Sequence, residues 1–154
     1  MPPLPIQPHL TRGCAALLLG LLLLFGGQPA AASLLHLAGP LPAELGIHNG
    51  ALAPCASPAH CSRRNWSTAD PAAVLEALLP AVLNLEGVEL IDSGAGYLHA
   101  TATSRLFGFV DDLELYADSE HQTLQARSAS RLGDSDLGVN ARRLDLLQQA
   151  LRAT

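Results

Sequence analysis

Two arginines and two aspartates form the part of this sequence that is best suited to chemistry. Arg127 and Arg131 stand four residues apart in a segment that alternates as a strand does, so both side chains should project to one face. The planar guanidinium group donates in a fork that matches a carboxylate or a phosphate. Asp111 and Asp112 lie in the preceding strand-like segment, where each charge needs a partner or water. The pattern therefore points to binding of an anionic group.

The same charges have a simpler interpretation as a ladder of ion pairs on a sheet face open to solvent. If residues 118–122 make the turn between the two segments, Asp112 or Glu114 faces Arg127 across the hairpin. Such ladders are common, and each exposed pair contributes up to about 1 kcal/mol. The sequence favours this solvated ladder over a recessed site in which Arg127 and Arg131 hold an anion.

Nothing in the sequence specifies a reaction. Ser128 and Ser130 could add hydroxyl groups to an anion site, but no neighbouring His and no nucleophile-elbow pattern supports a hydrolase triad. Asp111 shares the phase of Leu113 on the face that helices should cover, and we expect it to bond the Gly108 turn or an arginine. We therefore predict a non-enzymatic accessory or binding domain without catalytic residues. The alternative is an enzyme that acts on a small anionic substrate through Arg127, Arg131, Asp111 and Asp112.

Cys55 and Cys61 are most simply a disulfide if the chain is exported. Two alternatives stay open. His60 could lower the pKa of a redox-active Cys61 thiol, or His48 and His60 could join the two cysteines in a zinc site. The spacing lacks the short cysteine pairs of common zinc folds, so we predict a structural disulfide without a metal or cofactor.

The loop between the last strand and the last helix is rich in residues that cap helices. Asp134, Asp136 and Asn140 can each accept from backbone N–H groups at a helix start. Two aspartates at this spacing also suit calcium, but the further acid of a calcium-binding loop is missing. We expect Arg131 to reach the Asp134–Asp136 loop and to be partly buried there.

The N-terminus reads as a secretory signal over residues 1–32. Arg12 precedes an uncharged apolar run from Cys14 to Gly27, and Ala30–Ala32 supplies small residues for cleavage. The run is about 14 residues long, short of the roughly 20 that a spanning helix needs. An uncleaved membrane anchor is the alternative. The protein would then be exported, and a membrane would be a partner only if this segment is retained.

The charge balance makes nucleic acid an improbable partner. The chain has 14 acidic side chains against 9 basic ones, all of which are arginine, and its formal net charge is −5. A nucleic-acid-binding domain normally presents a basic surface. A protein or a small anionic ligand fits the composition better.

The remaining pattern predicts an α+β fold. Residues 33–69 lack a sustained period and read as an extended arm that carries the cysteine loop. Residues 70–154 form the core, with a helix that begins at Asp70 and kinks or ends near Pro80, and a last helix over 140–152. Between them we expect a four-stranded antiparallel meander over 88–92, 97–105, 109–117 and 123–132, with both helices packed on one face.

Four segments resemble one known family, DUF1499. They are Cys55-x5-Cys61, the run from Phe107 to Glu114, the run from Arg127 to Gly133, and the run from Ser135 to Asn140. The resemblance covers roughly Leu52 to Leu151. This chain departs from the family where His60 precedes the second cysteine in place of Asn, and where Ala141 follows Asn140 in place of Arg.

The resemblance implies an exported or membrane-associated protein without an assigned activity, of a kind found in bacteria and photosynthetic lineages. A cyanobacterial source would suit it. The periplasm or the thylakoid lumen is then the expected destination.

Overall fold

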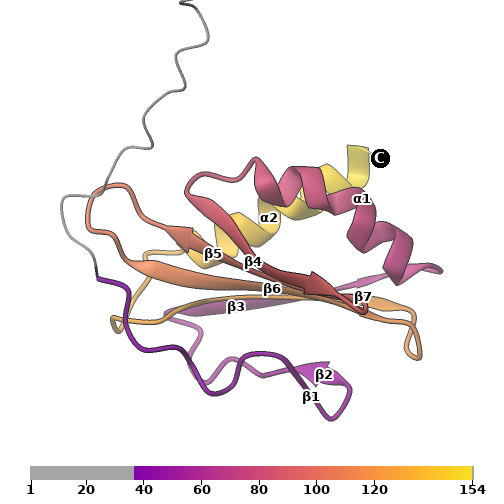
Figure 1. Ribbon diagram of the computed structural model, residues 1–154, viewed down its shortest axis with the longest axis horizontal. Coiled ribbons are helices and arrows are strands. Elements are labelled where there is room, and N and C mark those ends of the chain that lie inside the picture. Colours follow the sequence, from indigo (N-terminus) through magenta and orange to yellow (C-terminus); the bar gives the residue numbers. More distant parts are fainter. Residues whose placement is uncertain (1–36, 154) are drawn as a thin grey trace, which may run out of the picture. The chain divides into compact units, whose positions relative to one another are not determined.

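A computed structural model describes residues 37–153 of the chain. The predicted signal segment, residues 1–32, lies outside the described residues. Nine helices and strands follow one another within residues 37–153, and a five-stranded sheet with two helices on one face makes up most of this part (Figure 1). No helix among the described residues is long and apolar enough to cross a membrane.

The predicted meander is present and forms four of the five strands. Strands β4 (Val88–Gly94), β5 (Tyr97–Thr103), β6 (Val110–Asp118) and β7 (Thr123–Ser130) pair antiparallel in sequence order. The turn between β6 and β7 places Asp118 opposite Thr123, so that Glu114, one of the two expected partners, faces Arg127. Period-2 alternation with short links between the strands was sufficient to specify this part.

The fifth strand corrects our assignment of residues 61–69 to the arm. Strand β3 (Cys61–Ser67) pairs antiparallel with β7 and completes the order β3-β7-β6-β5-β4. Its side chains explain why alternation did not reveal it. Arg64 reaches Asp145 on the helix side, whereas Arg63 reaches Gln125 on the opposite face. Since both faces of β3 are polar, no hydrophobic period marks the strand.

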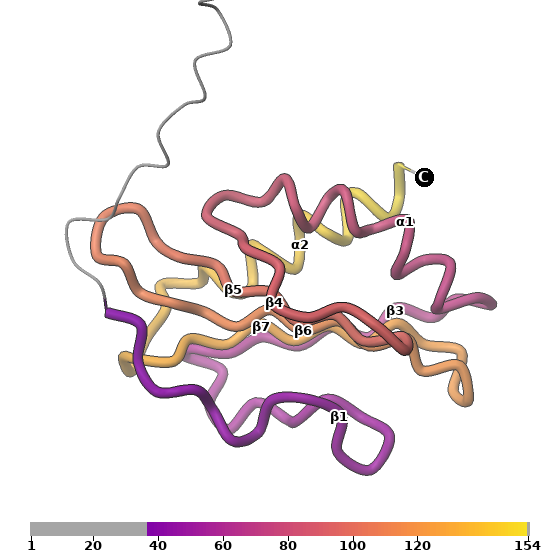
Figure 2. The backbone as a smooth tube through the Cα atoms, viewed as in Figure 1, coloured from indigo at the N-terminus to yellow at the C-terminus, as the bar shows by residue number. Residues whose placement is uncertain are grey.

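Helices α1 (Pro71–Leu83) and α2 (Val139–Ala153) cover one face of the sheet (Figure 2). Asp70 caps α1 by accepting from the Ala73 backbone N–H at 3.0 Å, as predicted. The helix continues to Leu83 and does not end near Pro80. Glu76, whose carbonyl would have bonded residue 80, lies with Pro80 on the exposed side, where water can satisfy that carbonyl.

The hydrophobic core lies between these helices and the sheet. Its fully buried side chains come from both helices and the three central strands: Leu78, Val82, Leu98, Leu113, Leu115, Leu124, Leu144 and Leu147. Alternate side chains of each strand point to opposite faces of the sheet, as the alternation predicted. The other face of the sheet, which we expected to be open to solvent, is covered as well.

The arm over residues 37–60 forms that cover. It runs beneath the sheet as Figure 1 shows, and it contains a hairpin of β1 (Ile47–His48) and β2 (Ala51–Leu52). Asn49 and Gly50 turn this hairpin with φ of 52° and 76°, the positive values that a type I′ turn requires. Leu52 and Ala53 are buried against the sheet. The polar face of the sheet is therefore an interior layer.

Candidate binding site beneath the arm

Strands β6 and β7 place an ion pair at the centre of the covered face. Glu114 and Arg127 are directly opposed in the register, and Nη1 of Arg127 donates to Oε2 of Glu114 at 2.8 Å. Both side chains are almost fully buried. A buried pair of this kind is stable only when further hydrogen bonds replace the water that each charge has lost.

The arm and β5 supply those hydrogen bonds to Glu114. The Gly46 backbone N–H donates to Oε1 at 2.7 Å, and the Tyr97 hydroxyl donates to the same oxygen at 2.8 Å. Burial and this hydrogen bond to Glu114 raise the pKa of the Tyr97 phenol. The Leu52 N–H donates to Oε1 of Gln125 at 3.0 Å. Sheet side chains thus satisfy the backbone of the arm and hold it in place.

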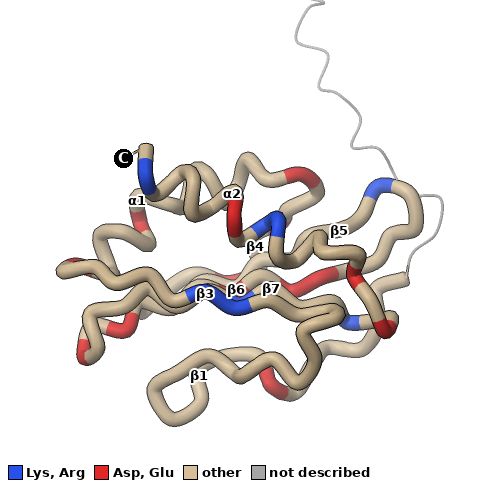
Figure 3. Tube along the Cα trace, turned by 180° about the vertical axis from the view of Figure 1, so that it is seen from behind, with Lys and Arg blue, Asp and Glu red and all other residues tan. Residues whose placement is uncertain are grey.

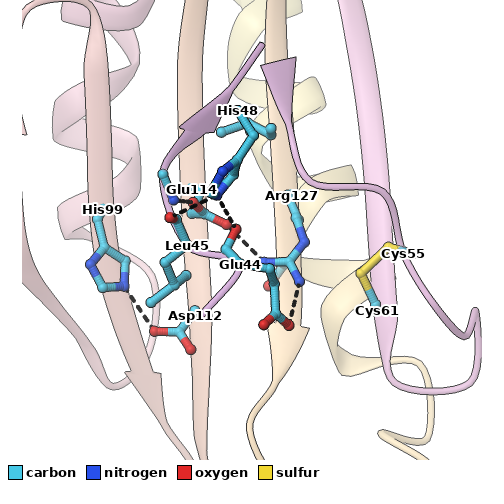
Figure 4. Close-up of polar contacts among 12 residues, drawn as sticks. Glu44, Leu45, His48, Cys55, Cys61, His99, Asp112, Glu114 and Arg127 are labelled. Carbon is cyan, nitrogen blue, oxygen red and sulfur yellow. Dashed lines mark hydrogen bonds and ion pairs between the residues drawn. A yellow bond between two sulfur atoms is a disulfide. The ribbon is translucent and has the colours of Figure 1, made fainter. Parts of the chain in front are cut away.

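A second ion pair lies farther along the same face. Arg131 donates from Nε and Nη2 to both oxygens of Asp112 at 2.8 and 2.7 Å. Nε2 of His99 lies 2.8 Å from Oδ1 of the same carboxylate, as Figure 4 shows. Burial alone would raise the pKa of Asp112. The hydrogen bonds from Arg131 and His99 outweigh that effect and lower it. The same contact raises the pKa of Arg131.

Two guanidinium groups lie side by side where β3 joins β7. Arg63 and Arg127 are directly opposed in the register, and Figure 3 shows the basic stretch along β3. Burial and the charge of Arg127 lower the pKa of Arg63. The fully buried carboxylate of Glu114 lies close to both groups. These two guanidinium groups carry one more charge than Glu114 can balance. Glu44 of the arm supplies the other negative charge: its Oε1 lies 3.4 Å from Nη2 of Arg127, and its side chain is 53% exposed.

A pocket of about 260 Å³ opens beside this pair, between the arm, β3 and β7. Arg127, Glu44, His60 and Cys61 contribute to its wall. Two buried nitrogen atoms in this wall, Nε of Arg127 and Nδ1 of His60, have no hydrogen-bond partner among the described residues. Buried polar atoms are normally satisfied, by protein, water or a ligand. The pocket lining therefore includes a guanidinium and an imidazole group, each with one buried nitrogen that has no partner among the described residues.

The disulfide closes the arm onto the sheet at one side of this pocket. Cys55 and Cys61 are bonded, as predicted, and Cys61 begins β3 (Figure 4). The bond excludes, in this oxidised form, a zinc site that uses the two thiolates. The described residues contain no cluster of three or more side chains suited to a metal ion.

A separate polar network lies on the helix side of the sheet. Arg143 of α2 donates to Asp111 at 2.9 Å and to Ser128 at 2.7 Å. Asn140, which is fully buried, accepts from Ser128 at 2.6 Å and donates to Ser130 at 3.0 Å. The expected arginine partner of Asp111 is therefore present. In the family that the sequence resembles, an Arg follows the residue at position 140. Here Ala141 stands at that position, and Arg143 donates to Asn140.

The six predicted binding residues thus divide between two faces. Arg127, Arg131 and Asp112 lie under the arm, whereas the Asp111 and Ser128 side chains bond the α2 network on the helix side. Ser130 accepts from Asn140 on the helix side and also borders the 260 Å³ pocket. The sheet therefore separates Asp111 from the other three members of the proposed catalytic cluster.

Two expectations for these charges were wrong. The ladder is not solvated, because the arm covers it and buries both ion pairs. Arg131 is partly buried as expected, but it pairs with Asp112 and not with the Asp134–Asp136 loop. Asp136 instead caps α2 by accepting from the N–H groups of Gly138 and Asn140, at 2.7 and 3.1 Å.

Sequence reasoning missed the residues that the arm and helix α2 contribute. Glu44 and Gly46 lie in a segment without periodicity, and their partners are more than 60 residues away in the chain. One local signal was available, because the Asn49-Gly50 dipeptide is a strong marker of a tight hairpin. Arg143 could have been recognised as the partner of Asp111, because it lies one turn into α2 on the side that faces the sheet.

Comparison with known proteins agrees with the resemblance found in the sequence. A search of curated proteins gave no match. The model of a family described as "Protein of unknown function (DUF1499)" matches residues 50–151, which include both faces of the sheet, the disulfide and both helices. The chain belongs to the DUF1499 family.

Proposed function

We propose that this protein is an exported, non-enzymatic binding domain that holds a small anionic group in the pocket beside Arg127. The cell envelope or a thylakoid lumen is the proposed destination. The apolar N-terminal run and the disulfide support export, since structural disulfides persist in oxidising compartments.

One observation carries the choice of ligand. Arg127 is buried, its Nε has no partner among the described residues, and its contact to Glu44 is long at 3.4 Å. The half-exposed Glu44 carboxylate already occupies the position that an external carboxylate or phosphate would take. A guanidinium fork suits either anion.

The pairing of the other buried charges favours binding over catalysis. Asp111 pairs with Arg143 and Asp112 with Arg131, and each carboxylate lies within 2.9 Å of its guanidinium nitrogen. An acid or base for catalysis needs a pKa near the working pH, whereas the pKa of Asp112 is lowered. An enzyme acting through Arg127, Arg131, Asp111 and Asp112 would also have to work from both faces of the sheet.

Calorimetric titration of the full chain with inorganic phosphate and with succinate tests the proposal. We expect saturable binding of at least one of them. Glu44→Gln should bind more tightly, because it removes the internal competitor. Ala56→Glu, which adds a negative charge to the pocket wall, should bind more weakly.

Ala73→Glu is the matched control. It adds the same charge at an exposed position in the first turn of α1, on the opposite face of the sheet, and it should bind like the wild type. Absence of binding in the wild type, or equal affinity in all four proteins, would refute the anion site.

A further inference from the structure

We infer that one end of the folded domain inserts apolar side chains into a lipid bilayer. This inference is independent of the anion pocket. It rests on an exposed apolar surface, on the point from which the chain continues toward its N-terminus, and on the charge of the protein.

Three loops at one end of the sheet expose large apolar side chains. They are residues 37–41 of the arm, the β5–β6 loop over 104–109, and the β7–α2 loop over 131–138, and Figure 2 shows them together. The surface that we call the apolar end consists of Leu37, Leu41, Leu106, Phe107, Phe109 and Leu137. Leu106 is 59%, Phe107 47% and Leu137 85% exposed. Several large apolar side chains exposed on neighbouring loops are typical of a docking site.

Backbone contacts hold the three loops together. The Leu37 N–H donates to the Gly108 carbonyl at 3.1 Å, and the Arg131 N–H donates to the Val110 carbonyl at 3.1 Å. Gly39 packs so closely on Leu132 that a Cβ there would lie 2.8 Å from its Cγ. The apolar side chains are therefore presented by a fixed surface.

The chain itself indicates what covers this surface. Leu37, at the apolar end, is ten residues after Gly27, where the apolar run from Cys14 ends. Ten residues span at most about 35 Å when fully extended. If the apolar run enters a bilayer, before or without cleavage, the apolar end cannot be farther than this from the lipid. The chain therefore enters the described domain at its apolar end.

The charge of the protein predicts how the contact is made. Arg105 and Arg142 flank the exposed apolar tips, but Glu86 lies 3.6 Å from Arg105, and Asp134 and Asp136 stand in the β7–α2 loop. With a net charge of −5, the chain has no reason to prefer anionic lipid. Attachment should rest on apolar insertion, which salt does not screen, so neutral phosphatidylcholine should suffice.

Tryptophan quenching by brominated lipid tests the inference. The full chain is reconstituted in phosphatidylcholine vesicles with a fraction of dibrominated phosphatidylcholine. Trp66, the only tryptophan, pairs with Leu124 at the end of β3 away from Cys61, so its emission should be unaffected. In a Trp66→Phe background, Phe107→Trp should lose emission, and the loss should persist at high salt.

Leu137→Trp probes the inference from a second loop if Phe107→Trp fails to fold. Ile91→Trp is the matched control, because Ile91 is exposed to a similar extent on the edge strand β4. Quenching at 107 or 137 but not at 91 or 66 supports insertion. Equal quenching at all positions, or none at 107 and 137, overturns it, and the second result would leave a protein partner or a second copy as the occupant. Quenching only with anionic lipid at low salt also overturns insertion.

Discussion

Glu114 of β6 and Arg127 of β7 face each other on neighbouring strands and form an ion pair at 2.8 Å from which water is nearly excluded. The same carboxylate accepts from Gly46, 68 residues earlier in the chain. This pair therefore does two things at once. It joins β6 to β7, and it provides the acceptor that fixes the arm over the sheet.

The first prediction concerns the arm. Glu114→Ala leaves Arg127 buried without its main partner and removes the acceptor of the Gly46 N–H. Breaking a buried pair costs about 3–5 kcal/mol, and urea denaturation should show a loss of this size. Hydrogen exchange at Gly46 should accelerate together with exchange at Leu52. Glu89→Ala, on the exposed edge strand β4, should change neither measurement, and protected arm amides in Glu114→Ala would contradict the role given to Glu114.

The second prediction concerns Arg131, whose side chain is 12% exposed. Arg131→Ala leaves the buried Asp112 carboxylate with His99 alone, so we expect a loss of roughly 2–4 kcal/mol in the free energy of unfolding. Arg105→Ala is the control, because Arg105 and Glu86 are both largely exposed and such pairs contribute below about 1 kcal/mol. Similar urea midpoints for the two variants would show that burial of the Asp112–Arg131 pair does not stabilise the fold.

The third prediction is a pH dependence that follows from Asp112. Its pKa is lower in the folded protein than the value of about 3.9 expected in the unfolded chain. The ionised carboxylate thus stabilises the fold fully above about pH 5, and this contribution is lost as the pH falls through the folded-state pKa. Asp112→Asn should be less stable at neutral pH and should lose less stability on acidification. Parallel curves for wild type and variant would contradict this.

The fourth prediction concerns the disulfide. The loop that Cys55 and Cys61 close is short, with a sequence separation of 6, so the chain-entropy model gives only about 2 kcal/mol. Reduction should lower the urea midpoint modestly and should loosen residues 53–60 in proteolysis. The sheet should stay folded because its core with the helices is unchanged, and the arm should stay on the sheet because the hydrogen bonds at Gly46 and Leu52 remain. Complete unfolding on reduction would show that the bond holds more than the arm.

The local part of the fold could be predicted from the sequence. Alternation predicted the meander, Asp70 and Pro71 marked the start of α1, and the turn over residues 118–122 limited the partner of Arg127 to Asp112 or Glu114, of which Glu114 is the one observed. Each of these features depends on neighbours in the chain. The assignment of side chains to two faces followed from the same parity and was correct.

The cover over the polar face could not be predicted in this way. Alternation states which side chains share a face and does not state whether water or another segment lies against it. The arm has no period, and its anchors are backbone N–H groups, which leave no trace in residue type. The partner of Arg131 was misassigned for a related reason, since the Asp134–Asp136 loop is close in sequence, whereas Asp112 is close in space.

The last prediction concerns the junction between α2 and the sheet. Arg143 donates to Asp111, Ser128 and Asn140, and the last two are fully buried. Arg143→Met keeps much of the side-chain volume but removes the hydrogen-bond donor of all three residues. The Asp111 carboxylate then has no positively charged partner. We expect a loss of about 2–4 kcal/mol in the free energy of unfolding.

Arg142→Met supplies the control for this prediction, because Arg142 is exposed and donates to the Leu137 carbonyl at the surface. It should change the free energy of unfolding by less than about 1 kcal/mol. The double variant Asp111→Asn with Arg143→Met should recover part of the loss, since it removes the unpaired charge. If Arg143→Met alone is as stable as Arg142→Met, the α2 network does not anchor the helix, and packing of Leu144 and Leu147 suffices.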